Sequence, residues 1–239
     1  MPATLAAYQL TDAYRAQQRQ VRDMAARGVV AAWQQITPAD FDGGFARFHP
    51  VATGIVTQAQ RLNAAVSAHY LSGYVNAETG ATDTPTAALD PSDYAHTDAG
   101  IPWSVAWTSG LVAAKLAVLQ GADPEAALRL GQVPVLRIAA SEPLNAGRSA
   151  LRDAMGQTDR VIGWRRVSGG GCWACDVAAT GAIHRDDTVP PVHPSCACTA
   201  EPVVRGVDDS RYSRQTPDVP AGAMDASEED KNLGGNDGE

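Results

Sequence analysis

The four cysteines of this chain all lie in one short stretch, which reads Cys172-Trp-Ala-Cys175 and, further on, His193-Pro-Ser-Cys196-Ala-Cys198. A Cys-x-x-Cys pair places two thiolates on one tight turn, where they can share a tetrahedral metal ion. A second turn, with a histidine and a cysteine three residues apart, can supply the remaining ligands. The sequence therefore predicts a small module organised by a metal ion, and zinc is the ion that this ligand type favours.

More side chains are present than a tetrahedral ion needs. The candidate ligands are Cys172, Cys175, His193, Cys196 and Cys198. We favour the first four of these as ligands, with Cys198 as a neighbouring thiol. An all-cysteine set is the main alternative, and His184 is a more distant candidate. A site with four protein ligands has no open position, so we expect the zinc to be structural and not catalytic.

Two disulfides are the competing interpretation, in which Cys172 or Cys175 is joined to Cys196 or Cys198. Two bridges between such closely spaced pairs would be crowded into one turn. The N-terminal residues also lack the basic start and apolar core of a secretory signal, so we expect a reducing compartment, the cytoplasm. The longest apolar run, from Gly110 to Leu119, contains Lys115 and is too short to cross a bilayer, so no membrane contact is expected.

The chain has 239 residues and a net charge of −8, and its apolar residues are dominated by alanine, which favours helices. We expect an α+β protein that is mainly α. Residues 1–157 form a helical domain, residues 158–205 form a zinc-ribbon-like β module that carries the cysteines, and residues 206–239 form a disordered acidic tail. Because the composition changes after Gln157, we do not expect the first two parts to share a core.

Helices are predicted from apolar periodicity and from capping residues. Thr11 or Asp12 caps a first helix that runs to about Gln35. A short helix follows and ends at His49-Pro50, where a second long helix begins. Further helices are expected over 102–120, from Asp123-Pro124 to Ala140, and over 143–155. Trp103 and Trp107, one turn apart, are predicted to be packing anchors.

The elements predicted after Gln157 are short. Residues 161–167 alternate as a strand does, residues 176–180 allow a short helix, and residues 199–204 are expected to form a return strand.

The cysteine region resembles a known family. Trp164-Arg-Arg-Val167, Cys172-x-x-Cys175, Pro191-x-His193-Pro-x-Cys196-x-Cys198 and Pro202 are similar to the minor head proteins of tailed phages related to the F protein of phage Mu. The Tyr70-Leu-x-x-Tyr74 segment is similar to versions from actinobacterial phages. The specific part of the resemblance covers Arg160 to Pro202. One position departs from the family pattern, because Ala197 stands where a basic residue is usual.

The resemblance implies a low-copy capsid component that lies inside the virion and acts in procapsid assembly near the portal. Its implied partners are the portal protein, the major capsid protein, or both. Because some related phage genes are described as head maturation proteases, a protease or other head-associated enzyme is one alternative. The chain has no Gly-x-Ser-x-Gly, His-Glu-x-x-His, Walker or dinucleotide-binding motif to support an enzyme.

A zinc module that contacts nucleic acid and is injected with the genome is the other alternative. Four arginines near the cysteines could neutralise a few phosphates and give weak, salt-sensitive DNA binding; they are Arg160, Arg165, Arg166 and Arg185. The acidic tail opposes this interpretation.

Overall fold

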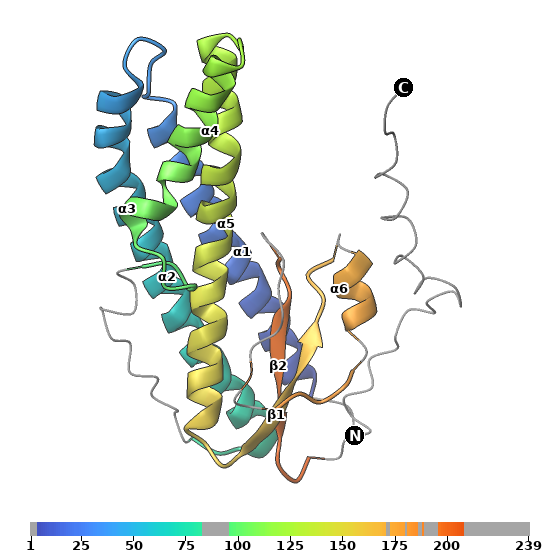
Figure 1. Cartoon of the computed structure of the whole chain (residues 1–239). Helices are drawn as coiled ribbons and strands as arrows, with labels where there is room; N and C mark the ends of the chain where they lie inside the picture. Colours follow the sequence, from blue (N-terminus) through green and yellow to red (C-terminus); the bar gives the residue numbers. More distant parts are fainter. Residues whose placement is uncertain are drawn as a thin grey trace, which may run out of the picture.

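The computed structural model describes residues 4–82, 96–170, 173–179, 181–185, 188 and 196–207. Over these residues the protein is mainly helical, with one two-stranded sheet beside the helices (Figure 1). The helices are α1 (Leu5–Trp33), α2 (Phe41–Thr79), α3 (Trp103–Ala106), α4 (Thr108–Leu119), α5 (Pro124–Gly156) and α6 (Trp173–Ala178). The strands are β1 (Val161–Val167) and β2 (Thr199–Val204). The predicted mainly helical class with a small sheet is confirmed. The predicted acidic tail falls almost entirely outside the described residues.

Helix α1 begins earlier than the sequence pattern predicts. Thr4 caps it, because the side-chain oxygen of Thr4 accepts a hydrogen bond from the backbone N–H of Ala7 at 3.2 Å. The sequence predicted Thr11 or Asp12 as the cap. Thr11 is instead buried inside the helix, and its hydroxyl donates a hydrogen bond to the carbonyl oxygen of Ala7. The cap prediction was wrong because Ala7 belongs to the core, and this burial extends the helix toward the N-terminus.

Helix α2 continues through Pro50, where the sequence predicted a break. Pro50 has no N–H and cannot bond to the carbonyl four residues earlier, which weakens the helix locally. Phe48 and Ala52, on either side of the proline, are both buried in one core cluster. Packing of the residues before and after Pro50 therefore keeps the helix continuous, although proline usually ends or kinks a helix.

Helix α5 starts as predicted and then continues further than predicted. Asp123 caps it with its carboxylate, and Pro124 occupies the first turn. The predicted interruption between Ala140 and Pro143 is wrong, because α5 is continuous through Pro134 and Pro143. The helix packs against α1, α2 and α4 along its length. Near Pro143, the side-chain amide of Asn63 in α2 donates to the Pro143 carbonyl oxygen at 2.9 Å.

One core cluster of the bundle is rich in aromatic side chains. Trp103 and Trp107 are buried and stack with their ring centroids 5.5 Å apart, so the prediction that they are packing anchors is confirmed. Phe48 packs edge-on against Trp107 and against Trp33. The indole N–H of Trp33 donates to the carbonyl oxygen of Leu128 at 2.9 Å, which ties the end of α1 to α5.

Helices α4 and α5 approach each other closely at two glycines. A Cβ atom added at Gly131 would lie 2.6 Å from the carbonyl oxygen of Gly110 and 2.8 Å from the Trp33 ring. A Cβ atom added at Gly110 would in turn lie 2.8 Å from the carbonyl oxygen of Gly131. The crossing therefore requires glycine in both helices.

The outer face of α4 is apolar and exposed. Val105 just before it, and Val112, Leu116 and Leu119 within it, are between 50% and 82% exposed. The buried positions of α4 are small, namely Gly110, Ala114 and Ala117, and they lie on the side that faces α5. The larger apolar side chains of this helix are thus left on the surface.

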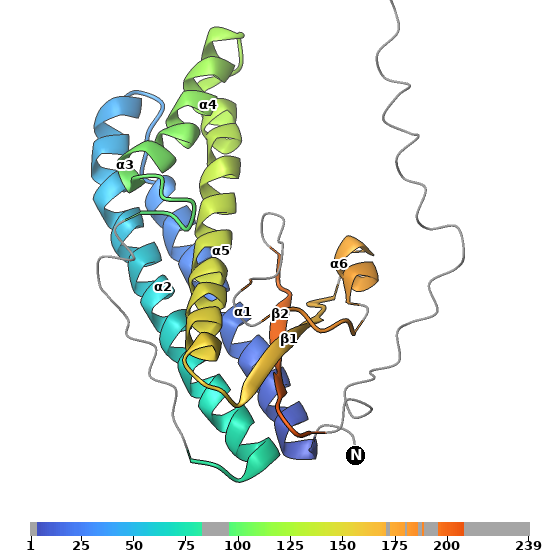
Figure 2. The same cartoon turned by 60° about the horizontal axis from the view of Figure 1, so that its bottom comes forward.

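The two predicted strands are both present and pair antiparallel, with Trp164 opposite Pro202 and Arg165 opposite Glu201. The other edge of β1 is met by a short segment in which His184 exchanges two backbone hydrogen bonds with Trp164, at 2.8 and 2.9 Å. Gly163 permits this approach, because a Cβ atom there would collide with the carbonyl oxygen of His184. In both views the sheet lies between the helical bundle and α6 (Figures 1 and 2).

The sheet and the bundle share a core, which corrects the expectation of two separate cores. Val161 and Trp164 of β1 and Val203 of β2 are buried in one cluster with Tyr14 of α1 and Tyr74 of α2. The composition change after Gln157 marks a change of secondary structure and not a gap in packing. Among the described residues, no helix combines the length and the apolar character that crossing a membrane requires.

Candidate metal centre

Three cysteines come together beside the sheet. The Sγ atoms of Cys175, Cys196 and Cys198 all lie within 4.8 Å of one another, and all three side chains are buried. The sulfurs of Cys175 and Cys196 are 3.5 Å apart. In a tetrahedral site with Zn–S bonds of about 2.3 Å, the sulfurs are about 3.8 Å apart, so the cluster fits a thiolate-bound metal ion.

Two separate segments supply these side chains. Cys175 lies on α6, a helix of six residues, and Cys196 and Cys198 lie on the segment that leads directly into β2. The start of α6 is fixed to the end of β1 by the hydroxyl of Ser168, which donates to the carboxylate of Asp176. The side chain of Arg15, in α1, donates to the backbone carbonyl oxygen of Ser168 at 2.6 Å. Both segments are therefore held by the sheet and, through Arg15, by the bundle.

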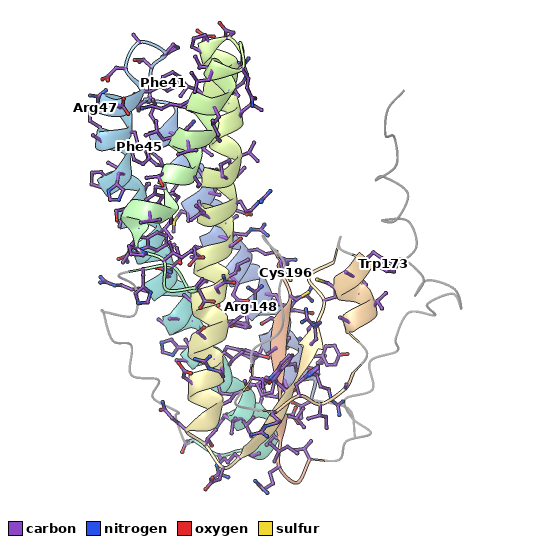
Figure 3. All side chains as sticks on the ribbon, viewed as in Figure 1. Phe41, Phe45, Arg47, Arg148, Trp173 and Cys196 are labelled. Atoms are coloured by element: carbon purple, nitrogen blue, oxygen red, sulfur yellow. The ribbon has the colours of Figure 1, made fainter. Side chains whose placement is uncertain are left out.

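Arg148 of α5 contacts the second cysteine segment directly. Its Nε and Nη2 atoms donate to the carbonyl oxygen of Cys198 at 3.2 and 3.0 Å, and Nη2 also donates to the carbonyl oxygen of Cys196. Its Nη1 atom donates to the side-chain oxygen of Asn145 at 2.9 Å. Figure 3 shows Arg148 on α5 next to Cys196. Arg148 is 6% exposed as a residue, and its guanidinium group connects the helical bundle to the cysteine cluster.

The clustered thiols lie next to the buried cation of Arg148. The thiol of Cys196 donates a hydrogen bond to Cys198, and this bond lowers the pKa of Cys198 and raises that of Cys196. The backbone N–H of Gly169 and the side chain of Arg166 also lower the pKa of Cys198. Burial lowers the pKa of Arg148, while the nearby Cys196 and Cys198 raise it. A buried cation is stabilised by an anion close by, and a deprotonated cysteine of this cluster would supply one.

Of the five predicted ligands, Cys172 and His193 lie outside the described residues, and the other three form the cluster. Which four side chains complete a metal site stays a prediction. His184, the more distant candidate, is not part of the cluster and stacks its ring on Trp164 at 4.2 Å. A disulfide needs sulfurs about 2.05 Å apart, so none joins Cys175, Cys196 and Cys198 to one another.

The four arginines considered for DNA contact fall into two groups. Arg165 and Arg166 are 6% and 8% exposed, and Arg160 and Arg185 are exposed. The buried pair lies within the sheet, and the exposed pair lies at the surface. Contact with DNA stays a prediction.

Sequence reasoning missed Arg148 and Arg15 as parts of the site. Arg148 lies 48 residues before Cys196, and Arg15 lies 160 residues before Cys175. The apolar periodicity of their helices indicates which side of each helix is packed, but it does not indicate contacts with a distant segment. One signal was present, because Arg148 occurs in a run of small residues that packs in the interior. An arginine at such a position requires a buried polar partner.

The protein is thus mainly helical, and the three clustered cysteines are buried beside its sheet. The chain belongs to the VG15 protein family, whose model matches residues 6–220. VG15 is a family of phage proteins, so this chain is a virion-related phage protein. Comparison with curated proteins and with solved structures finds no match. The family agrees with the phage origin implied by the cysteine motif, whereas the specific assignment to the minor head proteins stays a prediction.

Proposed function

We propose that this protein is a minor head protein of a tailed phage, which acts in procapsid assembly near the portal and contains a structural zinc ion. The observation that carries the proposal is the group of three buried sulfurs within 4.8 Å of one another. It occurs in a chain of a phage protein family and within the motif that resembles Mu F-like minor head proteins.

The residues that would hold the ion are Cys175, Cys196 and Cys198, with Cys172 or His193 as the fourth ligand. Bound zinc would join α6 to the segment before β2, because Cys175 and the other two cysteines come from different parts of the chain. The arrangement supports a structural role, since the three sulfurs are buried and a set of four protein ligands leaves no position for water or substrate. The expected contribution of the metal is therefore stability and shape.

The exposed apolar face of α4 supports a role in protein–protein contact. Val112, Leu116 and Leu119 lie on one side of a helix that packs on its other side against α5. Exposed apolar side chains that gather on one face mark protein interaction sites. We assign this face to the portal protein, the partner that the resemblance implies. A nucleic acid would instead require a cationic surface.

Co-purification with the portal protein of the same phage tests the proposal. Val112→Asp should reduce the amount of protein retained by the portal at least tenfold, because a charge would be placed in an apolar contact. Val51→Asp is a matched control, since Val51 in α2 is 51% exposed and Val112 is 52% exposed. Retention of the Val51→Asp variant and loss of the Val112→Asp variant would support the proposal. Absence of any portal binding by the wild-type protein would contradict it.

A further inference from the structure

We infer that Arg148 is a positioning residue that couples metal occupancy of the cysteine cluster to the packing of the helical bundle. This inference rests on the proposed metal centre. It goes beyond that proposal because it names the residue through which metal binding and helix packing influence each other. Arg148 touches no metal and acts through the backbone of Cys196 and Cys198.

The geometry of the guanidinium group supports this role. Three of its hydrogen bonds reach the carbonyl oxygens of Cys196 and Cys198, the first and last residues of the short turn that presents both thiols. Hydrogen bonds to these two carbonyl oxygens restrain the backbone from which both thiols project. Asn145, one turn earlier on α5, orients the guanidinium group through Nη1.

The same turn of α5 is packed tightly against the other long helices. A Cβ atom added at Gly147 would lie 2.8 Å from the side-chain nitrogen of Gln18 in α1 and 3.1 Å from the hydroxyl of Ser67 in α2. The α5 backbone next to Arg148 is therefore in close contact with side chains of α1 and α2. Arg148 links the segment that carries Cys196 and Cys198 to this turn of α5.

Charge favours the same coupling. Metal binding holds cysteines as thiolates, and three thiolates carry more negative charge than a divalent ion neutralises. The buried guanidinium group of Arg148 contacts the backbone of Cys196 and Cys198 and is close enough to offset that excess. Groups that orient and balance the ligands in this way typically contribute 10- to 100-fold to metal affinity.

The experiment uses the full chain and compares Arg148→Met with Arg152→Met. Arg152 is one turn further along α5 and forms a surface pair with Asp153, so its replacement controls for loss of an arginine from this helix. Zinc affinity is measured by competition with a chelator, and hydrogen exchange is measured with and without zinc. Arg148→Met should weaken zinc binding 10- to 100-fold, and Arg152→Met should leave it within about twofold.

Hydrogen exchange separates coupling from a general loss of stability. In the wild-type protein, removal of zinc should speed exchange in α5 around Arg148 and in the facing turns of α1 and α2. In Arg148→Met, exchange in these helices should no longer respond to zinc. Asn145→Ala provides a milder variant that keeps the buried charge, and it should weaken zinc binding in the same direction by a smaller factor.

The outcomes distinguish this inference from the proposed metal centre. If the wild-type protein binds no metal, both are wrong. If it binds zinc and the Arg148→Met and Arg152→Met variants bind zinc equally well, the metal centre stands and the coupling role is overturned. The coupling role is also overturned if zinc removal changes helix exchange as much in Arg148→Met as in the wild type.

Discussion

Arg148 donates two hydrogen bonds, from Nε and Nη2, to the carbonyl oxygen of Cys198, 50 residues further along the chain. This contact joins the last third of α5 to the segment that presents two of the clustered thiols. Together with the core shared by β1, β2 and the long helices, it makes the cysteine module part of the helical body. Substitution of a cysteine should therefore change the stability of those parts of the bundle that contact the module.

Replacement of Cys175 by serine should loosen the module and the core that it shares with the bundle. We expect hydrogen exchange to become at least about tenfold faster in β1 and β2 and around Tyr14 and Tyr70, which belong to that core. The aromatic cluster around Trp33 and Trp107 is separate and should keep its protection.

Trp173→Ser is the control for this experiment. Trp173 lies on the same helix as Cys175 (Figure 3). The residue is 56% exposed. Its replacement should leave exchange in the sheet unchanged. Uniform acceleration across both core clusters in Cys175→Ser would contradict the expected pattern.

Replacement of Gly131 by alanine should lower the free energy of unfolding. Alanine in the interior of a helix normally stabilises by up to about 1 kcal/mol relative to glycine. At Gly131 the new methyl group would meet the Gly110 backbone at 2.6 Å, and overpacking of this kind costs about 1–3 kcal/mol. Gly54→Ala in α2, where the methyl group would meet nothing within 4 Å, should instead be neutral or stabilising. Urea denaturation of both variants checks the sign of each change.

Glu142 should make stability fall as the pH rises from about 5 to 8. Burial raises its pKa from 4.5 to about 7, and the nearby charge of Asp98 adds to the effect. In the folded state Glu142 therefore keeps a proton that it loses at lower pH in the unfolded state. The contribution of Glu142 to the free energy of unfolding is complete below about pH 4.5 and is lost as the pH rises through about 7.

Glu142→Gln tests this dependence, because glutamine keeps an oxygen that can accept the hydrogen bond from the backbone N–H of Asp98. The variant should match the wild type near pH 4 and exceed its free energy of unfolding by about 3 kcal/mol at pH 8. An equal difference at both pH values would show that ionisation of Glu142 does not contribute.

Local rules predicted where α5 starts and where the two strands lie, and they failed where packing determines the structure. Asp123 and Pro124 start α5 as expected because capping depends on neighbouring residues alone. Pro50 and Pro143 do not end their helices, because buried residues on both sides of each proline are held by other helices. Such long-range packing has no local signature in a single sequence.

The candidate site shows the same division. The spacing of Cys175, Cys196 and Cys198 predicted that these side chains would meet, because ligand pairs on short turns are a local pattern. Arg148 could not be predicted as their neighbour, since its contact spans 50 residues and depends on how α5 lies against β2. The basic residues near the cysteines suggested DNA contact, but burial of Arg165 and Arg166 in the sheet gives them a structural position.

The most direct test of the central claim is the metal content of the full-length protein, purified under reducing conditions and weighed by native mass spectrometry. The cluster of Cys175, Cys196 and Cys198 predicts one zinc ion per chain. Cys175→Ser, measured in the same way, should lose the ion or bind it much more weakly. A wild-type mass that corresponds to the bare chain, with its cysteines either reduced or joined in disulfides, would contradict the claim.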